Sequence, residues 1–188
     1  MEPFVTYLGY QIDKAGIDTA PEKVNAIQDA PPPENVHKLK AFLGQLNYYS
    51  KFLPNLSQKL RSLFQLIKAD QPWKWTKEEA DTFQVSKDLL ASSNVLVHYD
   101  LSKELILACY ASQYGFGVVL AHKMANGTEY PIGYVSHTLS KAEENYSEIE
   151  KEGLACEFGV KRFHSYLYGH HFTLITDHNQ LLCLEKVK

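Results

Sequence analysis

The chain has 188 residues, of which 45% are hydrophobic and 22% charged, and its formal net charge at pH 7 is −3. This length allows one or two domains with buried cores, and the slightly acidic balance argues against a strongly basic nucleic-acid-binding protein. No apolar run approaches the roughly 18 residues of a membrane span, and the N-terminus lacks the pattern of a signal peptide.

The three cysteines are far apart and form no C-x-x-C pair, so neither a zinc site nor disulfides are expected. They are Cys109, Cys156 and Cys183. Two lie in apolar runs that are typical of buried thiols in an intracellular protein. The sequence does not distinguish a cytoplasmic from a nuclear location.

The charges are unevenly distributed. Between Glu34 and Asp70 there is no acidic residue, whereas residues 143–157 are rich in glutamate. The first region therefore suits contact with phosphates, and the second suits the binding of cations. The basic residues of the first region are Lys38, Lys40, Lys51, Lys59, Arg61 and Lys68.

The first half of the chain predicts a hairpin followed by helices. Residues 4–18 alternate and suggest strands that turn near residues 14–16. Thr19 and Glu22 have the spacing of a capping box, which predicts a helix to about Asp29, where the prolines 31–33 end it. Further helices are expected from the apolar spacing at residues 39–49 and 60–67, on either side of Pro54, and from a capping box that opens at Thr76 and leads to about residue 91.

The second half changes to a strand-like period. Strands are expected at residues 95–97, 104–111, 116–122 and 130–137, with a hairpin turn at Asn126-Gly127. Ser140 and Glu143 resemble a capping box for a long helix, which Gly169 terminates. A short strand over 172–176 and the start of a helix over 179–184 follow.

These elements predict an α+β or α/β fold. An N-terminal hairpin and a helical region precede a mixed β-sheet with one long helix, because three hairpin-connected strands are followed by a helix that crosses over to a fourth strand.

Ordered motifs along nearly the whole chain resemble the pol polyprotein of a gypsy-type LTR retrotransposon. Residues 4–10, FVTYLGY, resemble the primer-grip hairpin of a reverse transcriptase, and residues 42–49, FLGQLNYY, resemble the thumb. Residues 111–117, 145–152 and 176–178 resemble a ribonuclease H domain. The resemblance implies the end of the palm at 1–18, thumb and connection helices at 19–92, and a ribonuclease H-like domain, truncated at its C-terminus, at 93–188.

The resemblance also implies RNA-directed DNA synthesis and magnesium-dependent hydrolysis of RNA in RNA–DNA hybrids. In the family, four carboxylates hold two metal ions. Here Glu152 and Asp177 match two of them, Tyr110 occupies the position of the first aspartate, and the fourth lies beyond Lys188. Tyrosine is neutral at pH 7, so weak magnesium binding and little or no hydrolysis are expected. The polymerase motif Tyr-x-Asp-Asp does not occur in this sequence.

Contacts with an RNA–DNA hybrid or duplex are expected from several residues, and the rest of a pol polyprotein is a further expected partner. The expected contacts are Tyr7, Gly9, Lys38, Lys40, Lys51, Lys59, Arg61, Ser112 and Ser136. From pattern alone, Glu152 is more often a solvated charge, Asp177 is more often part of a turn or cap, and the basic region is equally a solvated face.

Three hypotheses follow from the sequence. The chain is a catalytically defective fragment of a reverse transcriptase and ribonuclease H, a non-catalytic nucleic-acid-binding module, or a relic without selected activity. A missing last helix would leave one face of the sheet uncovered, and this favours the third hypothesis.

Overall fold

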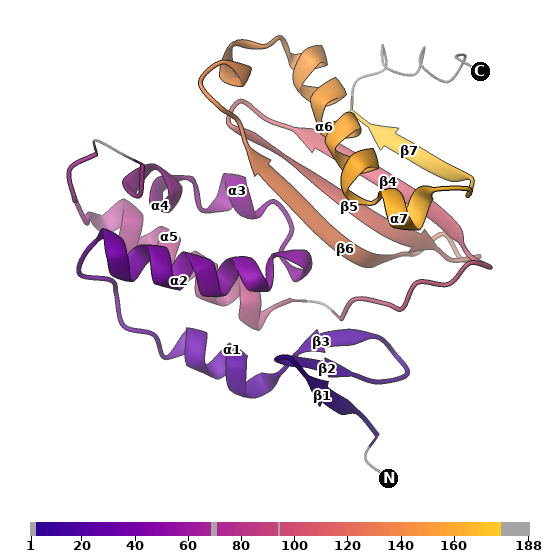
Figure 1. Ribbon diagram of the computed structural model, residues 1–188, viewed down its shortest axis with the longest axis horizontal. Coiled ribbons are helices and arrows are strands. Elements are labelled where there is room, and N and C mark those ends of the chain that lie inside the picture. Colours follow the sequence, from indigo (N-terminus) through magenta and orange to yellow (C-terminus); the bar gives the residue numbers. More distant parts are fainter. Residues whose placement is uncertain (1–2, 69–70, 94, 178–188) are drawn as a thin grey trace.

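The computed structural model describes residues 3–68, 71–93 and 95–177. The chain runs from a small sheet through a group of helices to a larger sheet that carries one long helix (Figure 1). This arrangement confirms the predicted mixed fold. None of the helices in the described ranges has both the length and the apolar composition of a membrane span.

The small sheet is antiparallel in the order β1-β2-β3. Its strands are β1 (Val5–Tyr7), β2 (Tyr10–Ile12) and β3 (Ile17–Thr19). The sequence predicted one turn in this region, near residues 14–16, but the chain also turns at Leu8 and Gly9, whose φ angles are 49° and 78°. A second turn forms where the Asp13 carboxylate accepts the backbone N–H of Ala15 at 2.7 Å.

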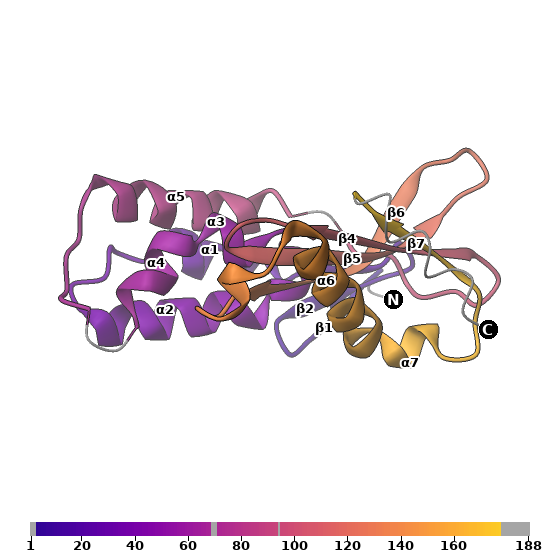
Figure 2. The ribbon, with the colours of Figure 1, turned by 90° about the horizontal axis from the view of Figure 1, so that it is seen from above.

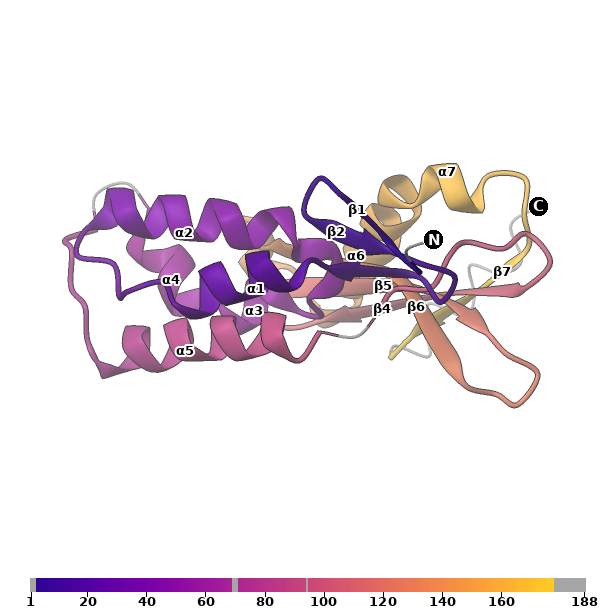
Figure 3. The same ribbon diagram turned by 90° about the horizontal axis from the view of Figure 1, so that it is seen from below.

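The helical region follows the predicted apolar stripes. Its elements are α1 (Pro21–Gln28), α2 (Val36–Tyr48), η1 (Ser50–Phe52), α3 (Leu56–Lys59), α4 (Arg61–Leu66) and α5 (Lys77–Ala91). After Pro54 the chain forms two short helices, which are separated at Leu60, and Asn55 adopts a left-handed conformation with φ of 54° just before α3. The small sheet lies beside the C-terminal end of α2 (Figure 3).

The sequence predicted three capping boxes, and one of them, at Thr76, caps the helix that was expected to follow it. Thr76 and Glu79 exchange the expected hydrogen bonds at the start of α5. Thr19 instead ends β3, and α1 begins after Ala20, which makes no side-chain cap. At residue 140 the prediction was also wrong, because the box there leads only into the short helix η2 (Glu143–Asn145).

The larger sheet has the order β6-β5-β4-β7. Its strands are β4 (Glu104–Ala111), β5 (Gly115–Lys123), β6 (Glu129–Thr138) and β7 (Phe172–Thr176). β7 pairs with β4 in parallel, whereas the other pairs are antiparallel, so the predicted mixed sheet is confirmed. The long helix α6 (Glu148–Arg162) starts at a box formed by Ser147 and Glu150.

Helix α7 (His164–Leu167) connects α6 to β7. Gly169, with φ of 79°, follows α7, whereas the long helix that it was predicted to terminate already ends at Arg162. Residues 95–97 do not form a strand of the larger sheet. Instead, Leu96 and Ile17 exchange two backbone hydrogen bonds and connect this segment to the small sheet. The helix predicted at 179–184 lies outside the described residues.

The two faces of the larger sheet are covered by different parts of the chain. One face of the sheet packs on α6 and is here called the inner face (Figure 2). It carries Leu107, Cys109 and Val118. On the opposite or outer face, α3 lies against β5 and β6, and η1 lies against β6. The expectation of an uncovered face is therefore wrong for this part of the sheet, because the helical region packs there.

Candidate functional site

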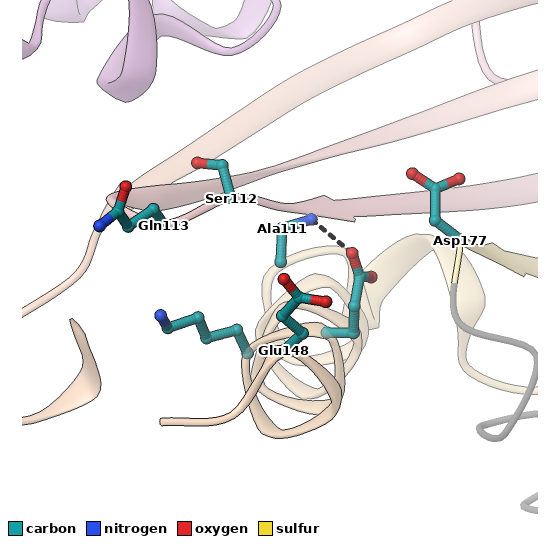
Figure 4. Close-up of a pocket in the computed structure, with 7 residues that line it drawn as sticks. Ala111, Ser112, Gln113, Glu148 and Asp177 are labelled. Carbon is teal, nitrogen blue, oxygen red and sulfur yellow. Dashed lines mark hydrogen bonds between the residues drawn. The ribbon is translucent and has the colours of Figure 1, made fainter. Parts of the chain in front are cut away.

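An open cavity of about 570 Å³ lies where β4 and β7 end, beside the first turn of α6 (Figure 4). Its lining residues are Ala111, Ser112, Gln113, Glu148, Lys151, Glu152 and Asp177. The structure thus brings three of the residues singled out in the sequence, Ser112, Glu152 and Asp177, to the same cavity.

Glu152 joins three elements at the inner side of this cavity. Its side chain is buried, with 6% of its surface exposed. One carboxylate oxygen accepts the backbone N–H of Ala111 in β4 at 2.8 Å, and the other accepts the Thr176 hydroxyl of β7 at 3.0 Å. Each carboxylate oxygen therefore already has a neutral hydrogen-bond donor within the protein.

Tyr110 and Asp177 lie on the outer face. Tyr110 follows the inner-face residue Cys109 in β4, so its side chain points away from α6. The carboxylate of Asp177 points away from Glu148 (Figure 4). Tyr110 is 41% exposed, and partial burial together with the negative charge of Asp177 raises its pKa, so the phenol is neutral at pH 7.

The residues that the structure describes do not form a complete site for two divalent ions. Such a site needs several carboxylates that converge on ions about 4 Å apart. Within the described residues no three His, Cys, Asp or Glu side chains form a group that suits a metal. Glu152 is engaged on the inner face, Asp177 lies on the outer face, and Tyr110 contributes no charge between them.

Besides Ala111, three polar residues of the cavity had not been predicted as site residues from the sequence. Glu148 precedes Glu152 by one helical turn and faces the same cavity, a spacing that the sequence does contain. Lys151 is buried and donates to the backbone carbonyl of Glu144 at 2.8 Å, which no local pattern indicates. Gln113 lies in the β4–β5 turn beside Ser112.

Two cysteines, Cys109 on the inner face of β4 and Cys156 on α6, are close neighbours. Cys109 and Cys156 are free, buried thiols. The hydrogen bond with Cys156 and burial both raise the pKa of Cys109, so this thiol is protonated at neutral pH. Cys183 lies outside the described residues.

The two serines expected to contact nucleic acid are engaged within the protein. The Ser112 hydroxyl donates to the Gly115 carbonyl at 2.7 Å and closes the β4–β5 turn. The Ser136 hydroxyl accepts the backbone N–H of Ser57 at 3.2 Å. Ser136 therefore contacts α3 rather than the cavity.

The hairpin residues Tyr7 and Gly9 lie at an exposed tip. Tyr7 is 63% and Leu8 is 66% exposed. The Tyr48 hydroxyl of α2 donates to the Leu8 carbonyl at 2.7 Å and fixes the tip against the helix. Beside this bond, the tip and α2 line a cavity of about 540 Å³, to which Leu8, Gly9, Gln45 and Tyr48 contribute.

The predicted basic residues are in different environments. Lys38 forms an ion pair with Glu34 at 2.7 Å. Lys51 lies 3.9 Å from the Tyr10 ring centre, and burial lowers its pKa. Arg61 lies on the ring of Tyr114. Lys40, Lys59 and Lys68 are exposed.

Comparisons with known proteins agree with this fold. The family model described as "RNase H-like domain found in reverse transcriptase" matches residues 75–174. The Tf2-3 and Tf2-4 transposon polyproteins of Schizosaccharomyces pombe (strain 972) are each 37% identical over 180 residues, which is 95% of this chain. The chain spans about 14% of the length of these relatives.

Solved structures of a foamy viral protease-reverse transcriptase share the fold. The dRH form in complex with double-stranded DNA has a TM-score of 0.81 and 24% identity, and the match covers 98% of this chain and 32% of that one. The complex with an RNA/DNA hybrid also has a TM-score of 0.81 and 24% identity, with 96% and 25% covered. The chain therefore belongs to the RNase H-like family found in reverse transcriptases, as its resemblance to a gypsy-type LTR retrotransposon polyprotein predicted.

Proposed function

We propose that this chain serves a reverse transcriptase by holding a nucleic-acid duplex against its hairpin tip and α2, while its own hydrolytic site is inactive. In this proposal residues 1–18 end the palm, residues 19–92 form the thumb and connection, and residues 93–188 form the ribonuclease H-like part. RNA-directed DNA synthesis and the other pol segments belong to the larger polyprotein.

The observation that carries the binding role is the conformation of Leu8. A left-handed backbone costs a non-glycine residue about 1–2 kcal/mol. Leu8 adopts φ of 49° although its side chain is 66% exposed and gains little from packing. A strained residue that presents an apolar side chain to solvent supports contact with a ligand at the tip.

Helix α2 supplies the adjoining surface. Lys40, Gly44 and Tyr48 follow at intervals of four residues and form one exposed stripe. Glycine inside a helix costs about 0.5–1 kcal/mol relative to alanine. A Cβ added at Gly44 would meet no atom within 4 Å, so packing inside the chain does not require this glycine. Close approach of a duplex backbone supplies a reason for it.

The ligand class is supported by the structural relatives, whose described complexes contain double-stranded DNA and an RNA/DNA hybrid. The acid-free segment after Glu34 is consistent with contact to phosphates. We therefore propose a duplex, with the RNA–DNA hybrid as the first to test.

The proposed inactivity follows from the separation of the carboxylates. Glu152 hydrogen-bonds to β4 and β7 on the inner face, Asp177 lies on the outer face, and Tyr110 is a neutral phenol. This set supports weak magnesium binding at most, so hydrolysis in the manner of the family is not expected.

The binding role is tested with Gly44→Ala and the matched control Gly153→Ala in α6, where an added Cβ also meets no atom within 4 Å. Both variants are expected to be slightly more stable. Fluorescence anisotropy with a labelled RNA–DNA hybrid should show affinity about five-fold weaker, about 1 kcal/mol, for Gly44→Ala alone. Equal affinity in the two variants, or no binding by the unmodified chain at low salt, would contradict the proposal.

The hydrolytic site is tested by magnesium-dependent cleavage of the same hybrid. The unmodified chain is expected to leave it intact, and Tyr110→Asp is expected to restore weak cleavage at most. The double variant Tyr110→Asp/Glu152→Gln is the control for a contaminating nuclease. Robust cleavage by the unmodified chain that Glu152→Gln abolishes would overturn the proposed inactivity.

A further inference from the structure

The helical region packs directly onto the outer face of β5 at Gly117. Register places Gly117 beside Tyr110 of β4 and Ser136 of β6, on the face away from α6. A Cβ added at Gly117 would lie 2.1 Å from the Oδ1 atom of Asn55 and 3.7 Å from its Cα atom. Any other residue at position 117 would displace the Asn55 side chain from this place.

Ser57 makes two hydrogen bonds at the same place. Its backbone N–H donates to the Ser136 hydroxyl at 3.2 Å, and its own hydroxyl donates to the His137 carbonyl at 3.1 Å. Ser57 is buried, so water does not readily replace these bonds. The residues are about 80 positions apart in sequence, so the contact joins two regions of the chain.

A third contact reaches the turn that borders the cavity. The Arg61 guanidinium lies 3.3 Å from the ring centre of Tyr114. Its Nε atom is buried without a hydrogen-bond partner in the described residues, so the stacking on the ring is the main interaction that holds this part of the side chain. Tyr114 belongs to the β4–β5 turn, together with the cavity residues Ser112 and Gln113.

We propose that α3 and Arg61 hold the β4–β5 turn in position, so that the conformation of the cavity rim depends on the docking of the helical region. The turn is held from one end by the Ser112–Gly115 hydrogen bonds and from its outer side by the contacts at Gly117 and Tyr114. A movement of the helices relative to the sheet therefore changes the position of Ser112 and Gln113. This inference does not depend on nucleic-acid binding.

The first test is Gly117→Val, which suits an extended strand but places methyl groups against the Asn55 side chain and backbone. Amide hydrogen exchange of the whole chain is measured residue by residue. Exchange is expected to become about ten-fold faster in α3 and in residues 112–115, with the centres of β4, β5 and α6 unchanged. The control Gly153→Ala should leave exchange in the turn as it is.

A rescue separates docking from general damage to β5. Gly117→Ala alone should accelerate exchange in the turn to a smaller degree, and Asn55→Gly in the same chain should reverse the effect, because glycine tolerates the left-handed conformation and removes the obstructing amide. Tyr114→Leu, which removes the Arg61 contact from the other side, should also accelerate exchange in the turn.

Unchanged exchange at residues 112–115 in Gly117→Val and Tyr114→Leu would overturn the proposal. The proposal would also be overturned if Gly117→Ala lowered protection uniformly throughout the sheet and Asn55→Gly in the same chain did not reverse this loss. The effect of the substitution would then be global rather than local.

Discussion

Tyr110 affects the electrostatics of its surroundings as well as the number of carboxylates available for a metal. It is on the outer face of β4, beside Asp177, and its pKa is raised by partial burial and by that carboxylate. An aspartate there would place two negative charges side by side, which is costly without a cation between them. The neutral phenol avoids this repulsion.

Glu152 is expected to act as a structural residue. Glu152→Ala would leave the backbone N–H of Ala111 and the Thr176 hydroxyl without their acceptor, at a cost of about 2–3 kcal/mol in the free energy of unfolding. Glu152→Gln retains one acceptor and should cost about half as much. Urea unfolding measures both, with Glu157→Ala on the exposed side of α6 as the control. Equal, small effects of all three substitutions would contradict a structural role.

Leu8 is expected to be less than optimal for stability. Asparagine tolerates the left-handed conformation better than leucine, so Leu8→Asn should raise the free energy of unfolding by about 0.5–1 kcal/mol. The same variant should bind the hybrid more weakly, because the apolar side chain at the tip is lost. Thermal unfolding and anisotropy measure the two effects, with exposed Val85→Ala as a comparison for a simple loss of apolar surface. A gain in both stability and affinity would argue against the binding role.

At the scale of single elements, the sequence predicted those helix caps and strands that are determined by residues close to one another in the chain. The Thr76 capping box and the four strands of the larger sheet are confirmed because each depends on local pattern. The capping-box pattern at Thr19 did not start the expected helix, because Thr19 pairs with Tyr10 in the small sheet. The capping-box pattern at Ser140 led only to the short helix η2. Local spacing does not contain that information.

The cap of α5 makes its stability depend on pH. The hydrogen bond from the Thr76 hydroxyl lowers the pKa of Glu79 below its ordinary value of 4.5. The contribution of Glu79 is therefore fully present above that value and is lost as the pH falls through the lowered pKa. The difference in unfolding free energy between the unmodified chain and Glu79→Gln should be constant above about pH 5 and shrink toward pH 3. A difference that grows on acidification would contradict this cap.

At the scale of the whole molecule, the contacts between regions could not be predicted. The resemblance singled out Ser112, Glu152 and Asp177, and the structure places all three at one cavity. The sequence does not indicate that the side chains of Glu152 and Asp177 lie on opposite sides of the sheet. Nor does it tell that Ser136 contacts Ser57, since that bond joins residues 79 positions apart.

A final prediction concerns how the affinity of this chain, whose net charge is −3, for the hybrid depends on the salt concentration. Each phosphate that a cation neutralises contributes about −0.9 to the slope of log affinity against log salt. Lys40 is exposed on α2, whereas Lys103 pairs with Asp100 before β4. Lys40→Ala should therefore make the slope shallower by about one, and Lys103→Ala should leave it unchanged. Anisotropy titrations with the hybrid at several salt concentrations measure both slopes. Equal slopes for the two variants would place the duplex elsewhere than on α2, because a lysine that contacts phosphate cannot be removed without releasing fewer counterions.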